Sequence, residues 1–66
     1  MDYTKDQLID AKFQIDSTIH KLIETKKTLE TKPNPNRYVS QITLASRRIE
    51  AFQIASNLIN EKLYNL

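Results

Sequence analysis

A 3-4 repeat of apolar residues, in which Ser56 is the one polar member, runs from Tyr38 to the C-terminus and constrains the fold more than any other feature of the chain. Its positions follow one another by four and three residues in turn: Tyr38, Ile42, Ala45, Ile49, Phe52, Ser56, Ile59, Leu63 and Leu66. Apolar residues at this spacing form one side of a helix that packs lengthwise, as in a coiled coil, on another helix. The repeat therefore predicts a long helix with a helical partner.

A proline-rich segment separates this helix from an earlier one. Residues 32–36 hold both prolines of a chain that lacks glycine. Because each proline disfavours helical geometry in the residue before it, we expect a turn at 32–34. Asn34 then suits an N-cap, with Pro35 at the first position of a second helix over about 35–65.

The first helix is expected over about 4–31. Thr4 and Gln7 have the spacing of a capping box, and Tyr3 and Leu8 that of a hydrophobic staple. Its apolar residues recur at Leu8, Ile15, Leu22 and Leu29. Folding about residues 33–34 sets Leu8 near Ile59 and Ala11 near Ser56. We therefore predict an all-α fold, an antiparallel two-helix hairpin that forms a single domain over residues 1–66.

Each helix carries more apolar surface than a hairpin needs. The second helix has a further stripe through Leu44, Ala51, Ile54, Ala55 and Leu58, and the first has one through Ile9 and Phe13. Surplus stripes of this kind indicate another partner. We predict a homodimer that forms a four-helix bundle, with the seven residues Ile9, Phe13, Leu44, Ala51, Ile54, Ala55 and Leu58 as its interface. A monomer with exposed apolar groups, a higher oligomer and a hetero-partner are the alternatives.

The composition limits which disulfides, metal sites and membrane spans one chain can form. The 66 residues include no cysteine and a single histidine, which excludes disulfides and thiolate or multi-histidine metal sites within one chain. Small scaffolds without such staples commonly oligomerise. No apolar run approaches the ~20 residues of a membrane span, and the first residues are polar. We expect a soluble cytoplasmic protein with no cofactor and no membrane association.

Three ionisable residues recur at intervals of four on the first helix. Asp16, His20 and Glu24 are spaced by four, so they share one side of the helix. This spacing suits a shared metal ion, but such carboxylates more often only hydrogen-bond the histidine. We favour a polar pair of Asp16 and His20 at the dimer seam, where it would specify register.

Basic residues concentrate near the turn. Residues 21–48 carry seven lysines and arginines against two glutamates, whereas the net charge of the chain is only +2. Lys26, Lys27, Arg47 and Arg48 are the candidate anion-binding residues, because a basic end of a hairpin attracts phosphates. No nucleic-acid-binding motif accompanies them, and lysines at exposed helical positions are usually solubilising.

No feature of the sequence points to catalysis: there is no nucleophile beside a base, no glycine-rich phosphate loop and no carboxylate pair in a cleft. We expect a non-enzymatic protein–protein interaction or structural module that acts as a homodimer and meets an unidentified protein partner. The alternative is a small nucleic-acid-binding accessory factor that uses the basic turn end.

Several short segments resemble a group of small uncharacterised proteins from Gram-positive Firmicutes. These segments are YTKDQL at 3–8, STI at 17–19, SQITL at 40–44 and RIEAFQI at 48–54. The group carries Y-T-K-E-x-L, S-T-I, S-Q-x-T-L and R-I-x-A-L-x-I. This chain differs at the turn, where the group has a glycine, and at Phe52, where the group has leucine. The resemblance implies a bacterial, cytoplasmic helical hairpin and carries over no functional residues.

Overall fold

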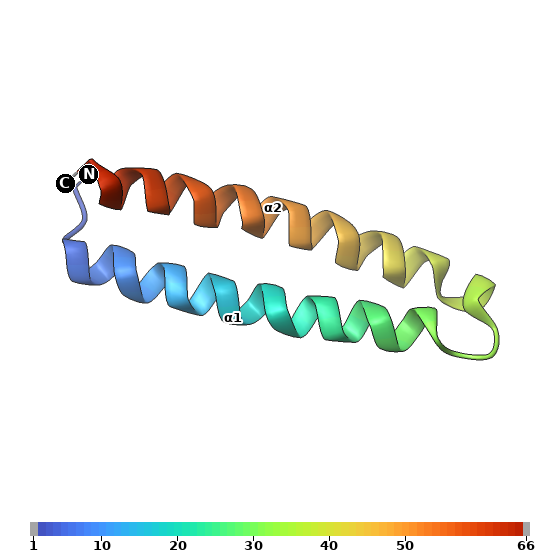
Figure 1. The fold of residues 1–66 in the computed structure, drawn as a ribbon. Helices are drawn as coiled ribbons and strands as arrows, with labels where there is room; N and C mark the ends of the chain where they lie inside the picture. The colour runs from blue at the N-terminus through green and yellow to red at the C-terminus, as the bar shows by residue number, and fades with distance from the viewer. Residues whose placement is uncertain (1, 66) are drawn as a thin grey trace.

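Two long helices fold back on each other (Figure 1). The computed structural model describes residues 2–65, which form α1 (Lys5–Glu30), a short 3₁₀-helix η1 (Pro35–Tyr38) and α2 (Val39–Tyr64). No strand occurs in this part of the chain. The molecule is a rod of 48 × 16 × 14 Å. The prediction of an all-α hairpin is thus confirmed, whereas the four-helix bundle involves a second copy and stays a prediction.

The start of α1 is set by local hydrogen bonds. The backbone N–H of Gln7 donates to Thr4 Oγ1 (3.1 Å), and the backbone N–H of Thr4 donates to Gln7 Oε1 (2.9 Å). These two bonds form the predicted capping box and satisfy backbone donors that the first helical turn leaves free. The helix ends at Glu30, where Thr31 is the C-cap.

The start of α2 differs from the expectation. We expected the helix from about residue 35, but Pro35–Tyr38 form a 3₁₀ turn and α2 begins at Val39. Asn34 is the N-cap of this turn as predicted, yet its side chain makes no capping hydrogen bond. Instead, its carbonyl accepts from the backbone N–H of Arg37 (3.0 Å). The shorter 3₁₀ turn completes the reversal that the two prolines begin.

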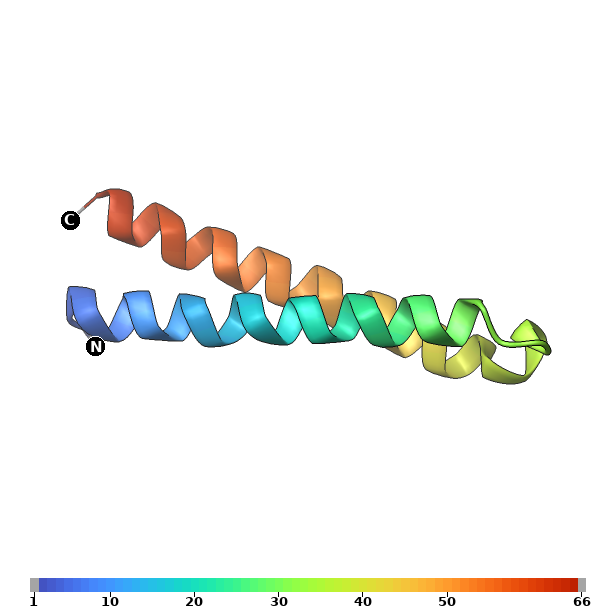
Figure 2. The same cartoon turned by 60° about the horizontal axis from the view of Figure 1, so that its bottom comes forward.

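The core of the hairpin is a narrow seam. Leu8, Ala45 and Ser56 are buried, and the remaining seam residues, such as Ile15 and Phe52, are half-buried. Leu8 and Ala11 line a groove with Ile59, which agrees with the predicted register at this end. In Figure 2 the axes of α1 and α2 cross at a shallow angle, as is usual for packed helices. Leu66, the last position of the repeat, lies outside the described residues.

Within residues 2–65, neither helix has the length and apolar character needed to cross a membrane.

Candidate functional site

The outer surface of α2 carries a row of uncovered apolar side chains, here called the α2 stripe: Leu44, Ala51, Ile54, Ala55 and Leu58. Leu44 is 48% exposed, Ile54 54% and Leu58 59%. Ala51 is also exposed, and Ala55 is half-buried. The hairpin leaves these residues uncovered because α1 covers only the 3-4 repeat on the other side of α2. An apolar row of this length on a small protein is typical of an interaction surface.

The predicted interface residues of α1 form a second apolar patch. Ile9 is 48% exposed and Phe13 is 67% exposed. Phe13 lines a shallow groove with Asp16, Ser17, His20 and Lys21. This patch is more polar than the α2 stripe, since its aromatic ring is bordered by charged and hydroxyl side chains.

The two apolar surfaces lie on opposite sides of the hairpin. Two grooves run between the helices: one is lined by Leu22, Thr25, Leu29, Gln41, Leu44, Ala45 and Arg48, and the other by Asp16, Ile19, Gln53, Ser56 and Asn57. Asp16 and Thr25 are nine residues apart, so at about 100° per residue they point to opposite sides of α1. We call these the Leu44 side and the Asp16 side.

Each stripe can be assigned to one of these sides. Ala51, Ala55 and Leu58 follow Leu44 by seven, eleven and fourteen residues. At about 100° per residue, all three return to within about 40° of Leu44. Phe13, in contrast, shares its groove with Asp16. Ile54, ten residues after Leu44, points about 80° away from it, whereas Ile9, seven residues before Asp16, points within about 20° of Asp16. The structure thus sets four α2 residues in one row with Ile54 beside it, and separates them from Ile9 and Phe13, so a single flat interface does not contain all seven.

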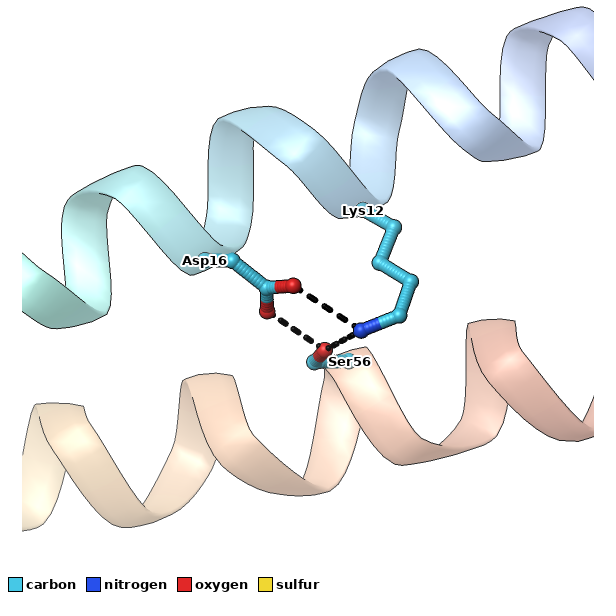
Figure 3. A network of polar contacts seen from close by, with 3 residues as sticks. All are labelled: Lys12, Asp16 and Ser56. Carbon is cyan, nitrogen blue, oxygen red and sulfur yellow. Dashed lines mark hydrogen bonds and ion pairs between the residues drawn. The ribbon is translucent and has the colours of Figure 1, made fainter.

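A polar network connects the helices on the Asp16 side (Figure 3). Lys12 Nζ donates to Asp16 Oδ2 (2.9 Å) and to Ser56 Oγ (2.9 Å). The Ser56 hydroxyl donates to Asp16 Oδ1 (2.6 Å). The hydrogen bond from Lys12 and then that from Ser56 lower the pKa of Asp16 below its usual range, and the positive charge of Lys12 acts in the same direction.

This network bears on two sequence-based predictions. Ser56 was expected near Ala11, and its hydroxyl bonds Lys12, the next residue of α1, and Asp16, a polar role that the apolar repeat did not predict. Asp16 was expected to pair with His20, but its carboxylate is taken by Lys12 and Ser56. The signal for this arrangement was Ser56 in an otherwise apolar repeat, opposite a lysine and an aspartate one helical turn apart. In the part of the chain that the structure describes, no three potential metal ligands gather.

The four predicted anion-binding residues do not form one patch. Lys26 is half-buried near the seam, and Lys27 lies 3.8 Å from the Glu24 carboxylate. Arg48 borders the groove of the Leu44 side. Thr25 borders the same groove as Arg48, and Lys27 follows it by two residues. Two residues correspond to about 200° around α1, so Lys27 points to the Asp16 side instead. Arg47 lies near Val39, Ser40, Thr43 and Leu44 on the outer surface of α2.

Lys32, another basic residue of the turn end, also contacts a side chain of the hairpin. Lys32 Nζ lies 5.3 Å from the centre of the Tyr38 ring, a cation–π distance. Together with the Lys27–Glu24 pair, this contact uses part of the positive charge of the turn end for local structure.

No family model matches this sequence, and comparison with curated proteins and with solved structures likewise found no match.

Proposed function

We propose that this protein is a non-enzymatic interaction module that works as a homodimeric helical hairpin. The observation that supports it is the α2 stripe, where Leu44, Ile54 and Leu58 are each about half exposed along one helix. Apolar area of this kind gains roughly 25 cal/mol for each Å² that is removed from water. A second copy supplies the same surface and covers it without any further component.

The thin core supports the same proposal. No large side chain of the described residues is fully buried, and Leu8 and Ala45 are the buried apolar residues among them. Chains of this size without disulfides or metal ions need additional burial for a stable fold. Association through an exposed apolar face supplies that burial. The patch around Phe13 is then available for a protein partner.

Sedimentation velocity at micromolar concentration tests the homodimer. We expect the mass of two chains, and we expect Leu58→Glu to weaken association by at least about tenfold, because a carboxylate would be buried in an apolar contact. Tyr64→Glu is the matched control: Tyr64 is 90% exposed, lies outside the stripe and should leave association unchanged. A wild-type chain that is folded and monomeric at these concentrations would overturn the proposal.

Binding of nucleic acid is a competing function with a separate test. The basic residues point in different directions, which does not favour a phosphate-binding surface. Generic duplex DNA and RNA should therefore show no binding at 150 mM salt, about the physiological ionic strength. Binding that falls steeply with salt, and that is lost when Lys26, Lys27, Arg47 and Arg48 are all changed to glutamine, would establish the alternative function instead.

A further inference from the structure

The apolar residues of the α2 stripe are arranged symmetrically about Ala51. Leu44 and Leu58 each lie seven residues from Ala51, one before it and one after it. Seven residues are close to two helical turns, so the three side chains lie in line at intervals of about 10.5 Å. A twofold axis that passes through Ala51 and reverses α2 brings Leu44 of each copy onto Leu58 of the other.

Side-chain size agrees with an axis at this point. Ala51 would lie on the axis and meet its own equivalent, and Ala55 lies one turn further along the same side. Small residues at a crossing allow two helices to approach to about 8 Å, the lower end of the usual range. The larger Leu44 and Leu58 then close the contact at its two ends.

The charges that border the stripe distinguish the two directions of pairing. Arg47 and Arg48 both lie beside Leu44, in grooves on either side of it. If two α2 helices ran parallel and in register, each arginine would face the same arginine of the other copy. In the antiparallel arrangement Arg47 faces Ala55 and Arg48 faces Ile54, so the aliphatic stems of the arginines cover apolar groups. Like charges are kept apart only in the second case.

We propose that two copies pair through antiparallel α2 helices about a twofold axis at Ala51, with Leu44 of each copy on Leu58 of the other. This arrangement rests on the homodimer proposed above and adds its geometry. It makes α2 the centre of a four-helix assembly and leaves α1 outside. Because Phe13 and His20 lie toward the Asp16 side, the dimer presents this patch twice, at symmetric positions.

Disulfide trapping tests the direction of pairing, and because the chain has no cysteine, only the introduced cysteines can cross-link. Leu44→Cys and Leu58→Cys chains are prepared separately, then mixed and equilibrated in a glutathione buffer. The mixture should give at least about ten times more cross-linked dimer than either variant alone, since a disulfide requires Cβ atoms about 3.5–4.5 Å apart. Gln53→Cys, exposed and on the Asp16 side, is the matched control and should not cross-link.

A distance measurement covers the case in which these substitutions weaken the dimer. Glu61 is exposed and lies ten residues from Ala51. Spin labels on Glu61→Cys should be about 30 Å apart or more along the axis of an antiparallel pair, but only about one helix diameter apart in a parallel pair. Short label distances, or cross-linking of each leucine variant with itself, would overturn the arrangement. A wild-type monomer in sedimentation would instead overturn the homodimer itself.

Discussion

Ser56 occupies a position of α2 where the repeat calls for an apolar residue, and it is only 5% exposed. Its hydroxyl accepts from Lys12 and donates to Asp16, so both of its hydrogen-bonding roles are satisfied across the hairpin. A shift of one helix along the other would bury this hydroxyl without partners, at a cost of about 1–3 kcal/mol. The network therefore specifies the register of the two helices in a seam that is otherwise uniform.

The lowered pKa of Asp16 predicts a dependence of stability on pH. A carboxylate whose pKa is lower in the folded chain stabilises the fold above its ordinary pKa of 3.8, and this contribution is lost as the pH falls through the lowered value. Asp16→Asn should therefore be less stable than the wild type at pH 7. The difference should shrink below about pH 3.8 in urea unfolding followed by circular dichroism.

Asp10→Asn is the control for this prediction, because Asp10 is an exposed carboxylate of α1 outside the network. Its difference in stability from the wild type should be smaller at pH 7. A difference between Asp16→Asn and wild type that is the same at pH 7 and at pH 3 would show that the charge of Asp16 does not stabilise the fold.

At the scale of the helices, boundaries set by neighbouring residues were predictable and those set by packing were not. Thr4 and Gln7 lie three residues apart and bond each other, so the start of α1 follows from the sequence alone. The start of α2 depends on how the chain returns to α1, and there the turn places the Tyr38 ring beside Lys32. The residues before α2 form a 3₁₀ turn, which local preferences alone do not specify.

Thr4→Ala tests the contribution of the capping box. Loss of the Oγ1 acceptor leaves the backbone N–H of Gln7 without its partner, so we expect about 1 kcal/mol less stability towards urea. Thr18→Ala is the contrast: Thr18 is a mid-helix residue whose hydroxyl bonds the carbonyl of Gln14. That change should be neutral or slightly stabilising, because alanine has the higher helix propensity. Equal losses for both variants would contradict the role of the cap.

The sequence predicts the exposed apolar residues of each helix, but not how the surfaces of the two helices lie relative to each other. Periodicity identified the exposed residues of the α2 stripe, and the structure shows four of its five members as exposed. Their position relative to Phe13 depends on how each helix is rotated about its own axis. That rotation is set by contacts across the seam, including the bonds of Ser56, and these pair residues 40 or more positions apart. The separation onto two sides thus became visible only in the folded hairpin.

For the whole molecule, stability and association are expected to be one property. Each helix has a single neighbour in a rod only 14–16 Å thick, so much of the apolar surface of α2 stays in water. When folding and pairing are coupled, the folded dimer is in equilibrium with two unfolded chains, and its stability depends on protein concentration. A hairpin that is stable alone would show no such dependence.

The dependence of stability on protein concentration can be tested without knowing which residues form the interface. A tenfold increase in protein concentration should favour the folded dimer by about 1.4 kcal/mol and raise the midpoint of thermal unfolding. Leu58→Glu should unfold at a lower temperature than the wild type at each concentration, because it weakens the association that stabilises the fold, whereas Tyr64→Glu should match the wild type. Calorimetry over a hundredfold range of concentration measures both effects. A wild-type midpoint that is constant over this range would mean that the α2 stripe is not covered by a second copy when the chain folds.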